Sequence, residues 1–114
     1  MKRLSAVFFV LCTILLSATL AGAHPPKSVN LSWDNGTLTV KVEHSVNDPQ
    51  KHYIYKIVVY VDNQVAAQKD YTSQPDAAGL TDRFALPSVK SGANVKAEAF
   101  CVIMGSTTGS ITIP

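Results

Sequence analysis

Seven short strand-like runs, several of which alternate between apolar and polar residues and each of which is followed by a turn signal or the chain end, constrain the fold of this chain more than any other feature. Alternation with a period of two places successive side chains on opposite faces of a β-strand. The chain after residue 23 shows no convincing helical period. About seven strands in about 90 residues are typical of an antiparallel sandwich. We therefore predict an all-β, immunoglobulin-like sandwich, with strands over residues 29–33, 38–43, 53–61, 65–72, 80–86, 95–100 and 110–113.

The connections between these runs carry their own signals. Asn35-Gly36 separates the first two runs, and Asn-Gly between alternating segments is a strong indication of a hairpin. Asp62-Asn63 predicts a second tight turn. The run over residues 53–61 is almost continuously apolar, which indicates a strand in the middle of a sheet. Residues 73–79 are polar and contain proline and glycine, so we expect an exposed loop there.

The first 23 residues have the three parts of a secretory signal. Lys2 and Arg3 form the basic start, residues 6–20 are mostly apolar, and residues 21–23 are small. The apolar run is short for a membrane span. We therefore predict cleavage after residue 23, which leaves one domain of residues 24–114 in the periplasm or outside the cell, without a membrane anchor.

Charge and cysteine content limit the partners of the mature domain. The whole chain has ten basic and eight acidic residues. Lys2 and Arg3 lie in the predicted signal, so residues 24–114 have a formal charge of zero and no basic surface suited to nucleic acid. Cys101 is the single cysteine of the mature domain, which excludes an internal disulfide. Its thiol is then buried, joined to another chain or bound to a metal, and the oligomeric state stays open.

Histidines and the cysteine fall where a sandwich can bring them together. His44 ends one predicted strand, His52 begins the next, and Cys101 lies at the end of a later strand. The loops of a sandwich gather at its two ends, so these side chains can share one end. Imidazole and thiolate suit iron, copper and zinc. The order of these residues predicts a metal site, whereas no pattern assigns a catalytic nucleophile or base.

Two segments resemble the superoxide reductases, also called neelaredoxins and the iron-binding domain of desulfoferrodoxins. In that family a His-Pro element leads into His-Tyr-Ile, and residues 44–54 end here in His52-Tyr53-Ile54. The family also has Cys-Asn-x-His-Gly near its C-terminus, where residues 101–105 read Cys-Val-Ile-Met-Gly. The similarity extends over most of residues 24–114. It implies an immunoglobulin-like sandwich with a mononuclear, non-heme iron at one end.

The resemblance also implies a ligand set and a reaction. In the family four histidines surround the iron in a plane, a cysteine thiolate binds on the axis, and the open position takes superoxide, which is reduced to peroxide. His52 and Cys101 match ligand positions, and His44 matches one approximately. Met104 stands where the family has a histidine, and His24 is a loose counterpart of its early histidine, so both are weaker candidates. For Met104 we expect packing in the core.

These comparisons lead to one leading hypothesis and two alternatives. The leading hypothesis is an exported, iron-binding domain similar to superoxide reductase, with an incomplete ligand set and altered or lost activity; superoxide and an electron donor would be its partners. One alternative is an immunoglobulin-like binding or structural module without metal. The other is a periplasmic copper binder, because imidazoles with sulfur ligands form a softer set. As the first mature residue, His24 would offer both its amine and its ring to Cu(II).

Overall fold

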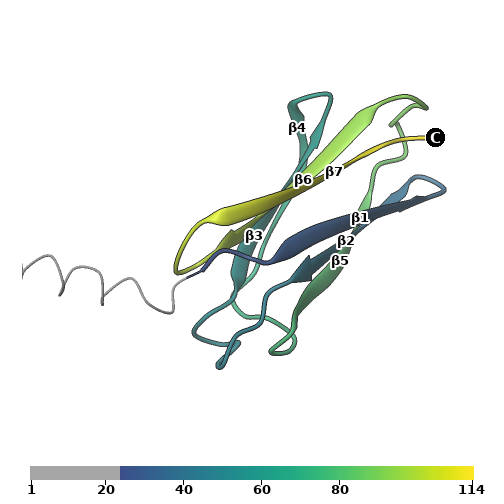
Figure 1. The fold of residues 1–114 in the computed structure, drawn as a ribbon. Helices are drawn as coiled ribbons and strands as arrows, with labels where there is room; N and C mark the ends of the chain where they lie inside the picture. The colour runs from purple at the N-terminus through teal and green to yellow at the C-terminus, as the bar shows by residue number, and fades with distance from the viewer. Residues whose placement is uncertain (1–23) are drawn as a thin grey trace, which may run out of the picture.

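The computed structural model describes residues 24–114, so the predicted signal peptide lies outside the described residues. These residues form two antiparallel sheets and no helix (Figure 1). A three-stranded sheet has the order β1-β2-β5, and a four-stranded sheet has the order β4-β3-β6-β7. The predicted all-β sandwich of seven strands is confirmed. The strands are β1 (Ser28–Asp34), β2 (Thr37–Glu43), β3 (Ile54–Val61), β4 (Gln64–Asp70), β5 (Gly79–Ala85), β6 (Asn94–Cys101) and β7 (Ser106–Thr112).

Both predicted hairpins are present, and their backbone angles explain the residues found there. Asn35 and Gly36 have φ of 51° and 84°, and Asp62 and Asn63 have φ of 48° and 67°. Two successive residues with positive φ match the right-handed twist of the flanking strands, and Asn, Asp and Gly tolerate this conformation best. The second hairpin joins β3 to β4. Because β3 also pairs with β6, it lies inside its sheet, as its apolar sequence predicted.

The core lies between the two sheets and follows the alternation of the strands. Leu38, Val40 and Val42 of β2 are at most 2% exposed, while Thr39 and Lys41 are not buried. In β6 every second residue from Val95 to Cys101 is buried in the same way. Each sheet therefore presents one apolar face to the other. Described residues include no helix long and apolar enough to cross a membrane.

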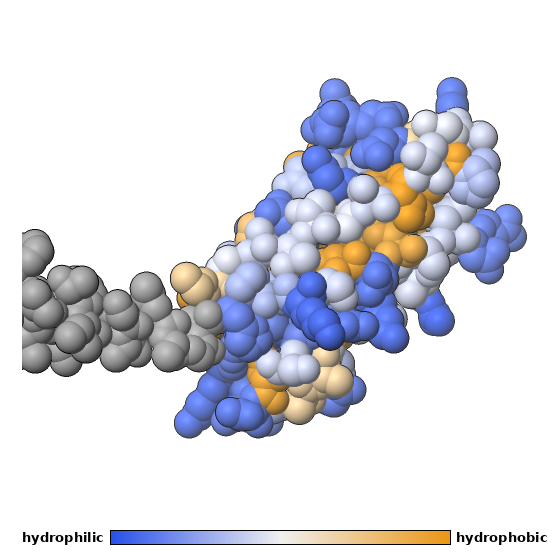
Figure 2. Space-filling view, in the orientation of Figure 1, coloured by the Kyte–Doolittle hydropathy of each residue, from blue (hydrophilic) through white to orange (hydrophobic). Residues whose placement is uncertain are grey.

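At one side of the sandwich β1 and β7, the edge strands of different sheets, lie next to each other (Figure 1). A Cβ atom at Gly109 of β7 would lie 2.0 Å from the carbonyl oxygen of Val29, so this approach requires glycine. Figure 2 shows an apolar stripe along this face. Leu31 and Ile111, both partly buried, pack against the core here.

The last strand is longer than predicted. Its expected range was 110–113, whereas β7 spans Ser106–Thr112. It pairs with β6 from Ser106 opposite Phe100 to Thr112 opposite Asn94. The first part of β7 consists of Ser, Thr and Gly, which give no apolar alternation. Backbone pairing with β6 extends this edge strand where its side chains give no signal.

Candidate metal centre

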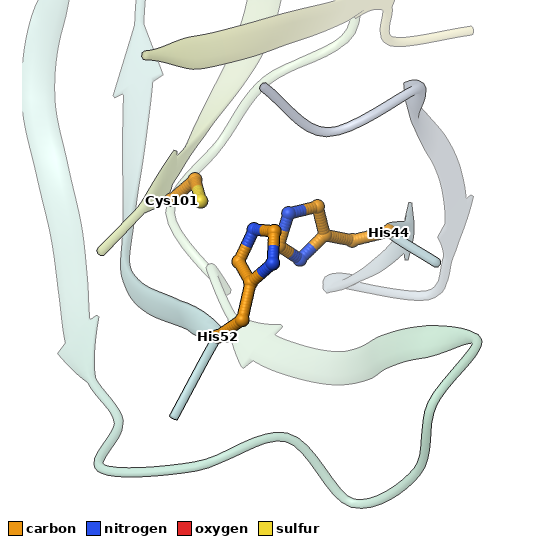
Figure 3. A group of neighbouring side chains, drawn as sticks. All are labelled: His44, His52 and Cys101. Carbon is orange, nitrogen blue, oxygen red and sulfur yellow. The ribbon is translucent and has the colours of Figure 1, made fainter. Parts of the chain in front are cut away.

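One end of the sandwich brings together the three residues that the sequence singled out (Figure 3). His44 follows the last residue of β2, His52 precedes β3, and Cys101 ends β6. One donor atom from each side chain lies within 4.8 Å of the other two. The predicted convergence of two imidazoles and one thiol is therefore present in the structure.

Strand alternation explains why two of these side chains point inward. His44 has the same parity as Val42, which is buried in β2, and the His44 side chain is itself 0% exposed. Cys101 has the same parity as Ala99 and is 4% exposed. The two residues thus approach each other from opposite sheets. The backbone N–H of His44 also donates to the carbonyl of Ala78 at 2.9 Å, which holds this position against the loop before β5.

His52 is held by a compact turn rather than by a strand. Its backbone N–H donates to the carbonyl of Asp48 at 2.9 Å, and the N–H of Lys51 donates to the same oxygen at 3.1 Å. The Asp48 side chain accepts from the backbone N–H of Gln50 at 3.0 Å. This turn places the ring of His52 4.7 Å from the ring of His44, between centroids, at an interplanar angle of 83°.

Two ring nitrogens at this end are buried without a protein partner. The Nε2 atoms of His44 and His52 have no hydrogen-bond partner among the described residues. A buried polar atom left in this state costs roughly 1–3 kcal/mol. Neutral imidazole nitrogens next to a thiol form the kind of donor set that iron, copper and zinc accept. The residues present therefore fit a bound transition metal.

Electrostatics favour the metal-binding form of His52. Burial lowers the pKa of His52, and repulsion from His44 and then from His24 lowers it further. A lowered pKa keeps the imidazole neutral over a wider pH range. A histidine binds a metal through an unprotonated nitrogen. The surroundings of His52 therefore favour the neutral form of its ring, which can act as a ligand.

The thiol of Cys101 sits at the start of a tight turn. It is free and buried. The backbone N–H of Ile103 donates to Sγ at 3.4 Å, and the N–H of Cys101 donates to the carbonyl of Gly105 at 3.0 Å. Gly105 has φ of 71°, which closes the turn. An N–H group directed at sulfur stabilises the negative charge that a thiolate ligand carries.

His24, a weaker candidate, lies beside the rings of His44 and His52. Its ring centroid is 5.6 Å from that of His44 and 5.3 Å from that of His52. The residues after it are anchored, because the hydroxyl of Thr107 donates to the carbonyl of Pro26 at 2.5 Å. The backbone N–H of Lys27 also donates to the carbonyl of Glu43 at 2.8 Å. A third imidazole is thus available at the exposed side of the centre.

Met104 does not pack in the core, so that expectation is wrong. Its side chain is 45% exposed, and the neighbouring Val102 and Ile103 are 41% and 55% exposed. The turn that returns the chain from Cys101 to β7 carries these three side chains outward. Metal ligation by Met104 stays a prediction.

The expectation of an exposed loop over residues 73–79 is wrong for Gln74. Gln74 is 4% exposed, and its Oε1 lies 2.5 Å from Nδ1 of His44. Its backbone N–H donates to the carbonyl of Pro49 at 2.9 Å. The side chain is buried because it satisfies polar groups that would otherwise lack partners. Nothing in the sequence marks this residue, which lies in a polar stretch next to Pro75.

No family model matches the chain, and no curated protein matches its sequence. Solved structures do match. A superoxide reductase (1Fe-SOR) from Giardia intestinalis aligns with a TM-score of 0.60 and 12% identity over 79% of this chain and 100% of that chain. A hypothetical protein from Pyrococcus horikoshii OT3 aligns with a TM-score of 0.54 and 16% identity, over 80% of this chain and 88% of that chain. A superoxide reductase from Nanoarchaeum equitans aligns with a TM-score of 0.48 and 12% identity, over 79% of this chain and 92% of that chain. This chain therefore has the β-sandwich fold of the Giardia superoxide reductase, which confirms the sequence resemblance at the level of the fold.

Proposed function

We propose that residues 24–114 are an exported metal protein that binds one iron through His44, His52 and Cys101 and reduces superoxide. One observation carries the proposal: two unpartnered imidazole nitrogens and a thiol converge at one buried end of a superoxide reductase-like fold. His44, His52 and Cys101 would hold ferrous iron, which would supply one electron to superoxide; with two protons from solvent this gives hydrogen peroxide, and an external electron donor would restore the ferrous state. Export is proposed from the secretory pattern of the first 23 residues.

The chain's own residues would divide the remaining tasks. The buried ring of His44 and the Cys101 thiol come from opposite sheets, so the sandwich itself fixes their separation. The N–H of Ile103 supports negative charge on the sulfur. His52 is partly exposed and His24 is exposed, so this side of the centre is open to a small anion and to protons from solvent.

The ligand set differs from the one that the family resemblance implies. We propose that superoxide reduction by this chain is altered relative to that of the family. Three imidazoles gather at this end, those of His24, His44 and His52. The sequence position of the remaining family histidine carries Met104, whose thioether is a softer donor. With three imidazoles in place of the family's four, this site would bind ferrous iron with lower affinity.

Copper binding is a second candidate, favoured by the same donor set. Two histidines with one cysteine is a combination that copper accepts well. The ring of His24, 5.3 Å from that of His52, adds a nitrogen donor that suits either metal. A copper-loaded protein would act as a carrier or in electron transfer.

The test is metal binding by the mature chain from His24, prepared without oxygen. Ferrous iron, Cu(I) and Cu(II) are offered separately, and metal content and visible absorption are measured. Stoichiometric iron with a thiolate-to-iron charge-transfer band on oxidation supports the first proposal, and superoxide reduction is then assayed. Stoichiometric copper without iron supports the second candidate. If neither metal binds, both proposals fail.

Variants locate the site within the chain. Cys101→Ser should abolish the charge-transfer band while the far-ultraviolet circular dichroism stays unchanged. An identical spectrum and metal content in this variant would contradict the centre described here. Val102→Ala is the matched control, because it changes an exposed side chain of the same turn and removes no candidate donor atom. A band that survives in Val102→Ala and disappears in Cys101→Ser assigns the thiolate.

A further inference from the structure

We infer that Gln74 is a positioning residue that fixes His44 in the tautomer with a free lone pair on Nε2. The inference rests on the proposed metal site, because it concerns how one ligand of that site is prepared. Neither the strand pattern nor the family resemblance pointed to Gln74. Its assignment comes from the contacts of one buried side chain.

The side-chain amide of Gln74 makes hydrogen bonds through both of its ends. Oε1 accepts from the backbone N–H of Ile54 at 3.0 Å and lies 2.5 Å from Nδ1 of His44. Nε2 donates to the backbone carbonyls of His44 and Asp76, each at 3.2 Å. Gln74 and His44 are 4% and 0% exposed, so solvent is largely kept from these groups.

Backbone groups settle which end of the amide is the oxygen. The N–H of Ile54 can only donate, so the atom facing it must be the acceptor, Oε1. The carbonyl of His44 can only accept, so the atom facing it must be the donor, Nε2. A flipped amide would set donor against donor and acceptor against acceptor. The orientation of the Gln74 amide is therefore determined by the main chain.

This orientation determines the tautomer of His44. Because Oε1 of Gln74 is an acceptor, Nδ1 of His44 must carry the proton. In the neutral ring Nε2 then has a free lone pair. That same Nε2 atom is buried and has no protein partner within residues 24–114. Gln74 thus presents the coordinating nitrogen of His44 toward the space that it shares with His52 and Cys101.

Gln74 also joins its own loop to the loop that carries His52. Its backbone N–H donates to the carbonyl of Pro49, in the loop between His44 and His52. Its side chain reaches Ile54, the first residue of β3. One residue therefore holds the loop before β5 against the loop before β3. An outer partner of this kind orients a metal ligand, and its loss typically lowers metal affinity ~10–100-fold.

The primary test measures the tautomer without any metal. The mature chain is labelled with ¹⁵N, and the imidazole nitrogens are observed by long-range ¹H–¹⁵N correlation at pH ~8, where free histidines are neutral. We expect His44 to show a protonated Nδ1 and an unprotonated Nε2. In Gln74→Leu, which has no acceptor, the Nε2–H tautomer should become populated. Gln74→Glu retains the acceptor toward Nδ1 and should preserve the wild-type tautomer, although it should lower stability because its second oxygen faces the carbonyls of His44 and Asp76.

The second readout is the affinity for Co(II), followed through thiolate-to-metal absorption. Gln74→Leu should bind Co(II) ~10–100-fold more weakly than wild type, and Gln74→Glu should stay close to wild type. Leu38→Ala is the stability control. Leu38 lies in β2, six residues before His44. At ~3.3 Å per residue of strand, Leu38 and His44 are about 20 Å apart. Its loss should lower stability without changing the His44 tautomer or the affinity.

Three results would overturn the inference: a wild-type His44 with its proton on Nε2, a Gln74→Leu variant with unchanged tautomer and affinity, or a Gln74→Glu variant in which the tautomer switches. The last comparison decides the matter if Gln74→Leu does not fold. Failure of the wild type to bind Co(II) would contradict the proposed metal function instead. The nitrogen spectra, taken without metal, would still decide the role of Gln74.

Discussion

Replacing His52 by phenylalanine should stabilise the metal-free protein. Nε2 of His52 is buried without a hydrogen-bond partner in the described part of the chain. Such an atom costs roughly 1–3 kcal/mol, and phenylalanine has a ring of similar shape with no polar atom. We expect the free energy of unfolding to rise by about 1 kcal/mol, the lower end of that range, because the His52 ring is partly exposed.

Acid should increase the difference. Burial, then repulsion from His44 and His24, lowers the pKa of His52 below its ordinary value of 6.5. The unfolded chain therefore binds a proton at a higher pH than the folded chain does. The wild type keeps its full stability above that ordinary value and loses part of it as the pH falls toward the lower folded pKa. Phenylalanine binds no proton, so its advantage should grow between pH ~7 and ~5.

Urea unfolding followed by the fluorescence of Trp33, the single tryptophan, measures both effects in the presence of a chelator. His44→Phe is the matched comparison, with a smaller expected gain. It also removes an unpartnered Nε2, but it removes the hydrogen bond between Nδ1 and Gln74 as well, and these two effects oppose each other. With metal added, the wild type should become the more stable protein, because a ligand that binds only the folded state stabilises it. A loss of stability in metal-free His52→Phe would show that His52 is a structural residue and refute this reasoning.

Three further predictions concern the sheet edge, the half-buried phenol of Tyr71 and the amino terminus. Gly109→Ala should lower the free energy of unfolding by ~1–3 kcal/mol, since its Cβ would lie 2.0 Å from the carbonyl oxygen of Val29; an unchanged urea midpoint would contradict this close approach. Tyr71→Phe removes a 2.6 Å hydrogen bond to Asp82 and should cost about 1 kcal/mol. Burial alone would raise the pKa of Asp82, but hydrogen bonds, first among them the one from Tyr71, lower this pKa below its ordinary value. An NMR titration of Tyr71→Phe should therefore show a higher pKa for Asp82. Acetylation of the amine of His24 in a synthetic mature chain should weaken Cu(II) binding; equal affinity would exclude the amine as a ligand.

The sequence was sufficient for features that depend on local alternation. Leu38, Val40 and Val42 follow a period of two, and the same period carries on to His44 at the strand end. Turn residues with a preference for positive φ marked both hairpins. The convergence of His44, His52 and Cys101 then followed from the tendency of sandwich loops to gather at two ends. These inferences require only residues that are close together in the sequence and the geometry of a sheet.

Features that depend on tertiary contacts were not predictable. Gln74 lies in a polar stretch and is buried only because distant backbone groups meet its amide. Met104 points outward because of the turn that Gly105 closes. As an apolar residue close to a strand end, Met104 was expected from the sequence to pack in the core. The early part of β7 forms because β6 offers a pairing edge. In each case the deciding interaction joins residues far apart in the chain or depends on a backbone angle.

The site also bears on how the domain resists force. His44 extends from the three-stranded sheet, whereas Cys101 ends a strand of the four-stranded sheet. An ion held by both would fasten the two layers at one end, within residues 24–114, whose single cysteine allows no disulfide between them. Coordination bonds form and break with the supply of the ion and the redox state of the thiol. The mechanical stiffness of the loaded domain would then follow the chemistry of its surroundings, which a permanent disulfide would not permit.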